Sequence, residues 1–159
     1  MPFLRRFFGS EHTASGRQLR DDAAVAVQGL DIDAAQAAHQ RWKQQLRAHL
    51  LSRGVPSAQT EPESPLDAES VCRDDRCDLG RWIHGPGRAR LGTFRGFSDL
   101  LAHHRMFHRV AGNVLALAAA GKPLDARRML DEQFEDYSQR VSDDLQLLKR
   151  VTSPLTPSD

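Results

Sequence analysis

Apolar side chains recur at helical spacing in three long stretches of the chain. In the first stretch, Ile32 to Leu51, the apolar positions are three or four residues apart, which places them on one face of a helix. The stripe reads Ala35, His39, Trp42, Leu46 and Leu50. Asp31 is a favourable N-cap for this helix, and Arg53-Gly54-Val55-Pro56 predicts its end.

The second and third stretches predict two more long helices. The second runs from Thr93 or Ser98 to Ala120 and is stopped by Gly121. Its stripe reads Phe97, Leu101, His104, His108, Ala111, Leu115 and Ala118. The third begins near Pro123, a residue favoured in the first turn of a helix. Its stripe reads Leu130, Phe134, Tyr137, Val141, Leu145 and Leu148. We expect this last stripe to be bundle core, and a homodimer seam is the alternative.

The segments between the long helices predict loops and short helical turns. Ser57 to Pro65 is rich in turn residues, and Leu66–Val71 predicts one helical turn. Cys77–Ile83 predicts one or two more turns, closed by Gly85-Pro86-Gly87. Because no β-type alternation occurs, the chain is expected to be all-α, an antiparallel four-helix-type bundle with short connecting helices and flexible termini.

The predicted bundle occupies residues 31–152. Residues 1–30 are expected to be a flexible arm with one short helix around Leu19–Val27, and 153–159 a flexible tail. The start of the arm carries two arginines between apolar side chains, which fits either a frayed leader or an amphipathic turn touching a membrane. These apolar residues are Phe3, Leu4, Phe7 and Phe8. We favour the leader.

Composition narrows the function classes. Hydrophobic residues make up 40% and charged residues 27% of the 159, as in soluble globular proteins. The net charge of +1 gives no electrostatic case for a nucleic-acid partner. No apolar run approaches the length of a membrane span, and the N-terminus is not a secretory signal. Two cysteines, Cys72 and Cys77, are too few for a disulfide scaffold, so we expect a cytoplasmic protein.

Four residues form the candidate metal site. His104 and His108 are one helical turn apart on the second stripe, where two imidazoles at i and i+4 can reach one ion. His39 lies on the first stripe beside Trp42, and Cys77 begins the short apolar segment. Three histidines and one cysteine complete a tetrahedral Zn²⁺ shell. Each of these histidines alone is also explained as a hydrogen-bonded core residue, and the set of four favours zinc.

A catalytic zinc site is disfavoured. Metalloproteases need a glutamate directly after the first histidine, but Arg105 follows His104 and Gln40 follows His39. The chain contains no Glu-x-x-His pair of the kind that di-iron bundles use. Four protein ligands close the shell, so we expect no enzyme activity.

Other polar residues receive lesser roles. We expect His103 on the surface or beside a metal ligand, and His84 in a turn. Asp78 is expected to be a solvated charge, and the alternative is that it accepts a hydrogen bond from a ligand imidazole. Cys72 lies five residues before Cys77, and it is either an incidental small residue or a thiol that resolves oxidised Cys77 as a disulfide.

At these residues the chain resembles the chemoreceptor zinc-binding (CZB) domain family of bacteria. The ordered motifs are His39-Gln40-Arg41-Trp42, Cys77-Asp78-Leu79-Gly80-Arg81-Trp82 and His104-Arg105-Met106-Phe107-His108. The resemblance extends over about Asp31 to Arg150. It implies a four-helix-type bundle in which His39, Cys77, His104 and His108 bind zinc. It also implies regulation of chemoreceptors or diguanylate cyclases, with sensing of zinc or, through the cysteine, hypochlorous acid.

The sequence therefore predicts a zinc-binding sensory or regulatory module of bacterial signalling, with Cys77 as a redox-responsive ligand. Oxidation is expected to detach the segment that holds Trp82. No methyl-accepting coiled coil or cyclase motif occurs in the 159 residues, so we expect a separate signalling protein as partner, from a chemoreceptor or cyclic-di-GMP system. The alternative is a structural protein in which zinc staples a helical interaction or dimerisation module.

Overall fold

The computed structural model describes residues 16–27, 30–52 and 67–152. These residues form helices and connecting turns, with no strand among them. The helices are α2 (Gly16–Ala26), α3 (Ile32–Ser52), α4 (Ala68–Val71), α5 (Asp78–Trp82), α6 (Arg88–Leu91), α7 (Arg95–Ala119), α8 (Pro123–Met129) and α9 (Glu135–Thr152). Two π-helical turns, η1 (Ile83–Gly87) and η2 (Leu130–Phe134), join α5 to α6 and α8 to α9. The all-α prediction is confirmed.

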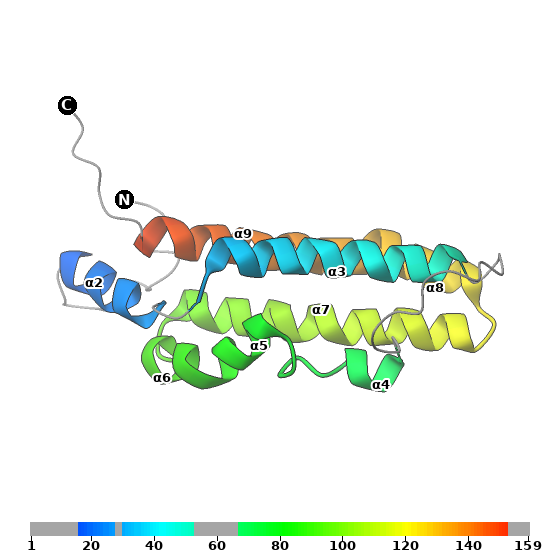
Figure 1. The fold of residues 1–159 in the computed structure, drawn as a ribbon, viewed down its shortest axis with the longest axis horizontal. Helices are drawn as coiled ribbons and strands as arrows, with labels where there is room; N and C mark the ends of the chain where they lie inside the picture. Colours follow the sequence, from blue (N-terminus) through cyan, green and yellow to red (C-terminus); the bar gives the residue numbers. More distant parts are fainter. Residues whose placement is uncertain (1–15, 28–29, 53–66, 153–159) are drawn as a thin grey trace, which may run out of the picture.

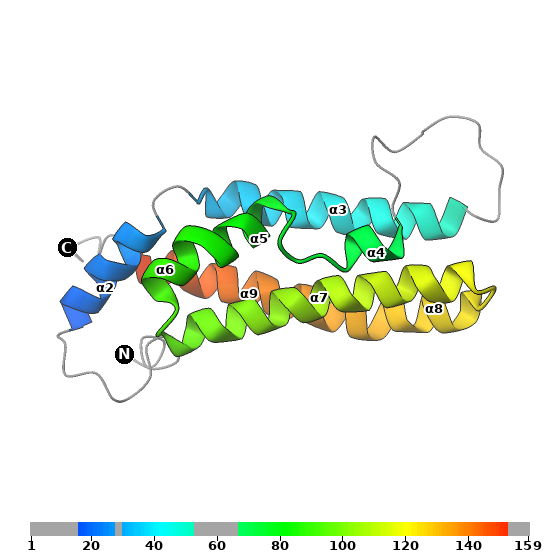
Figure 2. The same cartoon turned by 90° about the horizontal axis from the view of Figure 1, so that it is seen from below.

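Three long helical rods and one broken rod lie side by side along the molecule (Figure 1). Helices α3 and α7 run in the same direction, and the continuous rod α8–η2–α9 returns beside them (Figures 1 and 2). The fourth rod is the broken series α4, α5, η1 and α6, which runs back along α7 (Figure 2). In the described residues, no helix is long and apolar enough to cross a membrane.

The ends of the long helices follow the predicted capping signals. The Asp31 carboxylate accepts a hydrogen bond from the backbone N–H of Ala34 at 2.9 Å, which satisfies one free donor at the start of α3. At the end of α7, Gly121 has φ +71°, and the N–H of Lys122 donates to the carbonyl of Leu117 at 3.0 Å. This is a Schellman turn, which needs the left-handed conformation that glycine adopts without strain. The predicted stop at Gly121 therefore has a clear physical cause.

The helix that begins at Asp78 is broken within the predicted Gly85-Pro86-Gly87 segment, and a second helical segment follows the break. The chain kinks at Gly85, which has φ −104° and ψ −112°, and continues through η1 into α6. Proline is tolerated near the start of a helical turn, where its missing N–H is not needed. Burial of Ile83, Gly87 and Leu91 holds the continuing turns against the core. The local breakers therefore produce the kink at Gly85, and packing holds the segment that follows against the core.

The core lies between α7, the α8–α9 rod and the broken rod. Its largest fully buried side chains include Phe97, Phe107, Phe134, Leu46, Ile83, Leu91, Leu100, Leu130, Leu145 and Leu148. Each such side chain contributes roughly 1.5–3 kcal/mol of transfer free energy when removed from water. Except for the half-buried Tyr137, the predicted stripe of α8 and α9 is buried within this core. The interpretation of that stripe as core is favoured over a dimer seam.

Part of the predicted arm packs against the bundle. The helix expected around Leu19–Val27 is present as α2, which contacts α9 and α6. Ala23 of α2 is fully buried, and the carbonyl of Val25 accepts a hydrogen bond from Arg90 of α6. Residues 16–27 are thus docked on the bundle, because this helix buries one small face. The remainder of the arm and the tail 153–159 lie outside the described residues.

Helix α3 is attached to the α8–α9 rod largely through polar side chains. It meets α9 and η2 through a row of hydrogen bonds and ion pairs, which we call the polar seam. The seam consists of Asp33–Lys149, Gln36–Gln146, His39–Ser138, Gln40–Ser142, Lys43–Glu135, and Arg47 with Asp131 and Glu135. Exposed ion pairs contribute only about 0–1 kcal/mol each because water screens them. The seam therefore aligns α3 more than it secures it.

Candidate metal centre

Two of the predicted ligands come from the middle of α7. His104 and His108 lie one turn apart, with only 1% and 8% of their surface exposed and ring centroids 4.7 Å apart. The i, i+4 spacing on a helix places both rings on one face. The core-facing position of this stripe then buries them together.

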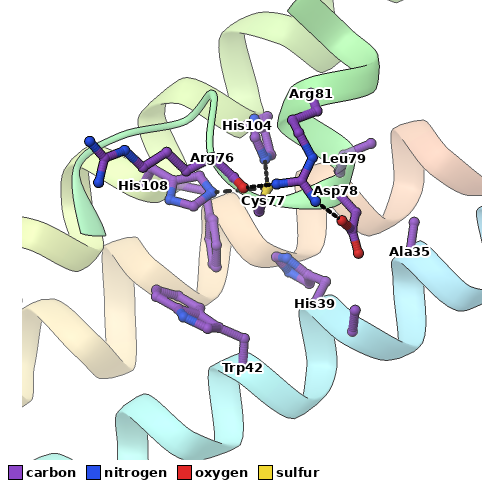
Figure 3. Close-up of a pocket in the computed structure, with 12 residues that line it drawn as sticks. Ala35, His39, Trp42, Arg76, Cys77, Asp78, Leu79, Arg81, His104 and His108 are labelled. Carbon is purple, nitrogen blue, oxygen red and sulfur yellow. Dashed lines mark hydrogen bonds and ion pairs between the residues drawn. The ribbon is translucent and has the colours of Figure 1, made fainter. Parts of the chain in front are cut away.

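Cys77 brings a sulfur atom to these two rings. It is the N-cap of α5, and its Sγ lies 3.3 Å from His104 Nε2 and 3.7 Å from His108 Nε2 (Figure 3). One ligand atom from each residue lies within 4.8 Å of the others. Among the described residues this is the group of histidine, cysteine and acidic side chains arranged to hold a metal ion.

The spacing of these donor atoms fits zinc. Bonds of about 2.3 Å to sulfur and about 2.0–2.1 Å to nitrogen, at tetrahedral angles, place the two donors about 3.6 Å apart. The two sulfur–nitrogen distances, 3.3 and 3.7 Å, lie on either side of that value. The donor set also matches in kind, because zinc binds thiolate sulfur and imidazole nitrogen.

Hydrogen bonding orients His108 for this role. Its Nδ1–H donates to the backbone carbonyl of Val71 at 2.8 Å, which leaves the Nε2 lone pair facing Cys77. His104 Nδ1 has no hydrogen-bond partner within the described residues. The polar contact of this ring is therefore the one between Nε2 and Cys77 Sγ. Both rings thus direct Nε2 to the same point.

Burial keeps the imidazole rings of His104 and His108 neutral, and the neutral imidazole is the form that binds metal. Burial lowers the pKa of His104 to about 2, with further lowering from His108 nearby. Burial likewise lowers the pKa of His108, although its hydrogen bond to Val71 opposes the effect. The pKa of the Cys77 thiol is raised by burial, against a hydrogen bond from the Gly80 N–H at 3.2 Å. A bound dication would favour the thiolate instead.

His39 lies on the facing wall, on α3. It lines the same cavity as the group of three, and its side chain points from α3 toward Cys77 (Figure 3). Its Nε2, however, is hydrogen-bonded with Ser138 Oγ of α9 at 2.9 Å. The structure therefore brings three of the four predicted ligands together and leaves His39 outside that group. Its role as the fourth ligand stays a prediction.

A comparison with known families agrees with the geometry. Residues 39–115 match the model of the chemoreceptor zinc-binding domain family, and this span includes all four predicted ligands. The chain carries a CZB domain. No curated protein and no solved structure matches it. Zinc is accordingly the metal for the group formed by Cys77, His104 and His108. The matched span is shorter than the predicted resemblance and ends within α7.

The CZB motif residue Gly80 is required by a close approach of the chain. A Cβ atom at this position would lie 1.9 Å from the backbone oxygen of Asp74 and 2.9 Å from its carbonyl carbon. Backbone atoms cannot yield to such a contact, so any side chain would push the 74–76 turn away from α5. Because Cys77 follows that turn, Gly80 fixes where the thiol lies.

A cavity of about 260 Å³ separates α3 from the metal group. Cys77, His104 and His108 form one wall, and Ala35, Ala38, His39 and Trp42 form the wall on α3. Phe107 lies between the two, with ring centroids 4.4 Å from His39 and 5.4 Å from Trp42. Asp78, the acidic side chain lining this cavity, is ion-paired with Arg81. Asp78 is exposed, as predicted for a solvated charge, and it also forms this ion pair with Arg81.

The side chain of Trp82, in the CZB motif, lies in the core and not on the surface. It is 4% exposed, and its ring lies 6.0 Å from the ring of Phe97 in an edge-to-face arrangement. Leu79 and Gly80 are also buried. Detaching this segment would expose large apolar groups, so the expectation that oxidation frees Trp82 is disfavoured.

Several functional contacts were not evident from the sequence. His84 is not only a turn residue, because its Nε2 lies 3.0 Å from the Asp74 carboxylate. His103 is not a free surface residue, because its Nδ1 lies 2.7 Å from the carboxylate of buried Asp144 on α9. The spacing of His103 and Asp144 along the chain gave no signal for this contact. Cys72 is exposed, and its Sγ lies where a side chain on Gly112 would be.

Proposed function

We propose that this CZB domain is a zinc-dependent sensory module in which Cys77 is the ligand that responds to oxidants. The observation that carries the proposal is a difference in exposure within one site. All three ligands line the cavity, but Cys77 is partly exposed, whereas His104 and His108 are buried. A small oxidant therefore meets the sulfur first.

The chemistry of Cys77 follows from its setting. With zinc bound, Cys77 would be held as the thiolate at neutral pH. The thiolate attacks the chlorine of hypochlorous acid, and hydrolysis of the S–Cl bond gives a sulfenic acid, so that overall RS⁻ and HOCl yield RSOH and Cl⁻. Sulfur loses two electrons and chlorine gains them. The product is a weaker donor than the thiolate, which leaves His104 and His108 to hold the ion.

The consequence is expected in α3 rather than in α5. The inner face of α5 is anchored by Leu79 and Trp82, which are buried. The wall on α3 consists of two alanines, His39 and Trp42, and the helix is otherwise held by the polar seam and by buried Ile32 and Leu46. If His39 completes the shell in the loaded protein, it links α3 to the centre, and losing the ion removes that link. We propose that the freed α3 is what a partner detects.

Matched cysteine variants test this proposal. Zinc release is followed with a metallochromic dye while one equivalent of hypochlorous acid is added to wild type, Cys77→Ser and Cys72→Ser. Cys72 is exposed and lies outside the metal group, so Cys72→Ser controls for general thiol oxidation. We expect Cys72→Ser to release zinc as wild type does and Cys77→Ser to lose the oxidant response. A response of Cys77→Ser equal to wild type would contradict the proposal.

A structural role for zinc is the second candidate, and the burial of two neutral imidazoles in the core favours it. Buried polar groups without partners are costly, so an ion that satisfies them stabilises the fold. Removing zinc with a chelator separates the two functions, as followed by far-ultraviolet circular dichroism. A sensor stays largely helical without metal, whereas a protein stapled by zinc unfolds.

We also propose where this protein acts and which proteins it contacts. A free thiolate ligand suits the reducing cytoplasm, and we propose that location. The partner would be a signalling protein of a chemoreceptor or cyclic-di-GMP system, or a second copy of the chain. We propose no enzyme activity, because the one acidic side chain lining the cavity, Asp78, is engaged by Arg81.

A further inference from the structure

The turn that leads into Cys77 is fastened by one acidic residue. Asp74 lies three residues before Cys77, and its side chain is 18% exposed. Its carboxylate contacts His84 Nε2 of η1 at 3.0 Å and Arg105 Nε of α7 at 3.7 Å. One carboxylate oxygen, Oδ2, makes both contacts. Asp74 therefore joins the turn to two elements that are separate from it in sequence.

The same residue is also held through its backbone. The Asp74 carbonyl oxygen occupies the space beside Gly80, where a Cβ atom would lie only 1.9 Å away. Gly80 in turn donates its N–H to Cys77 Sγ. Asp74 is thus in contact with α5 through its main chain and with η1 and α7 through its side chain. Cys77 lies between these points of attachment.

The contact on α7 is next to a metal ligand. Arg105 directly follows His104 in the helix, so a link from Asp74 to Arg105 ties the turn to the part of α7 that carries the imidazoles. The charge of Asp74 also reaches the site, because it opposes the lowering of the His108 pKa that burial causes. A negative charge beside a site for a dication favours binding.

We propose that Asp74 is a positioning residue of the zinc site, which holds Cys77 against His104 and His108 through its contacts with His84 and Arg105. The inference rests on zinc binding by this group and not on the oxidation of Cys77. Residues that orient metal ligands typically change the affinity for the metal by 10–100-fold when they are replaced. The sequence gave no sign of this role, because the partners of Asp74 lie 10 and 31 residues further along the chain.

The neighbouring residue provides a matched control. Asp75 is also near the site, and its charge acts on His108 in the same direction. Its carboxylate, however, pairs with Arg73 within the turn, at 3.0 Å, and both side chains are about half exposed. Asp75→Asn therefore removes the same charge as Asp74→Asn without releasing the turn from η1 and α7.

The test compares zinc affinity by chelator competition for wild type, Asp74→Asn and Asp75→Asn. We expect about a tenfold loss of affinity for Asp74→Asn and a much smaller change for Asp75→Asn. With Co²⁺ in place of zinc, the thiolate-to-metal absorption band should weaken in Asp74→Asn at saturation, since the band depends on how Cys77 meets the ion. Equal losses in the two variants would reduce the effect to charge alone and overturn the positioning role, as would wild-type affinity in Asp74→Asn.

Surface variants of the partners keep the test valid if Asp74→Asn does not fold. Arg105 is 59% exposed and His84 is 27% exposed, so Arg105→Gln and His84→Gln should leave the helices intact. Each is expected to weaken zinc binding, and the effects should not add to those of Asp74→Asn because the residues act as one unit. Unchanged affinity in both partner variants would overturn the proposal. Because no oxidant is used, the result does not depend on the outcome of the Cys77 oxidation experiment.

Discussion

His39 of α3 and Ser138 of α9 are hydrogen-bonded at 2.9 Å, and both are more than nine-tenths buried. The histidine is hydrogen-bonded to Ser138 and lines the same cavity as the metal group, so these are its two candidate partners. Which one it binds determines whether α3 is linked to the zinc centre.

We predict that His39→Ala retains zinc binding by the remaining three residues but weakens it at least tenfold. Loss of one protein ligand opens a coordination position to water. With Co²⁺ bound, the visible absorption of the variant should shift from the pattern of a tetrahedral centre toward that of a water-containing one. Gln40→Ala is the control, because Gln40 takes part in the polar seam but lies outside the cavity. Identical Co²⁺ spectra for wild type and His39→Ala would exclude His39 as a ligand.

Gly80→Ala is expected to disrupt the centre through the backbone. Its new Cβ would lie 1.9 Å from the Asp74 oxygen, and relieving such overpacking typically costs about 1–3 kcal/mol. We expect a lower free energy of unfolding and weaker zinc binding, because the turn before Cys77 must move. Arg88→Ala is a control on the same rod, since Arg88 of α6 is exposed and helical. Chemical denaturation and chelator competition measure both effects, and equal behaviour of the two variants would count against the close approach.

The stability of the metal-free protein should depend on pH. Burial lowers the pKa of His39 from 6.5 to about 4 and that of His104 from 6.5 to about 2. Between these values the unfolded chain binds more protons than the folded chain, so stability falls as the pH falls. The contribution of each histidine is complete above about pH 6.5 and is lost progressively down to its folded pKa.

Urea denaturation of the metal-free protein from pH 7.5 to 5 measures this dependence. The slope should approach about 1.4 kcal/mol per pH unit for each histidine that titrates. His39→Gln removes one titrating group and should make the profile less steep. A flat profile for the wild type across this range would contradict the burial of neutral imidazoles.

Helix α3 should open more readily than α7 when zinc is absent. Besides the polar seam, its large buried apolar side chains are Ile32 and Leu46, whereas α7 carries more of them in the core, among them Phe97, Leu100 and Phe107. Local opening free energies follow buried apolar contact. Hydrogen exchange of peptides from Ile32–Ser52 and Arg95–Ala119 should show faster exchange in the first, and protection of the first on adding zinc. Equal protection of the two helices without metal would contradict the weak attachment of α3.

The long helices could be predicted because their apolar stripes and caps are local. Asp31 and Gly121 signal a start and an end within a few residues, and packing reinforces both. Gly85-Pro86-Gly87 likewise signals the kink at Gly85. The helical segment that follows it, α6, was not predicted, because burial of Gly87 and Leu91 against distant core residues gives no local signal.

The metal group was predictable for a similar reason. His104 and His108 share one helix face, so their convergence follows from spacing, and a cysteine was the remaining soft ligand. The contacts of His39 with Ser138 and of Asp74 with Arg105 were not predictable. They join residues 99 and 31 positions apart, and the sequence carries no periodic signal for such pairs.

The broken fourth rod places α5, whose N-cap is Cys77, midway along the molecule instead of at one end (Figure 2). A shared ion bonded to Cys77 and His104 would close a loop of 27 residues, which contains α5, η1, α6 and the first turns of α7. Treated as a cross-link, such a closure restricts the unfolded chain and is worth roughly 3.5 kcal/mol. In this sense the centre is a reversible counterpart of a disulfide bond: losing the thiolate contact would return this conformational entropy to the unfolded chain and so lower the free energy of unfolding.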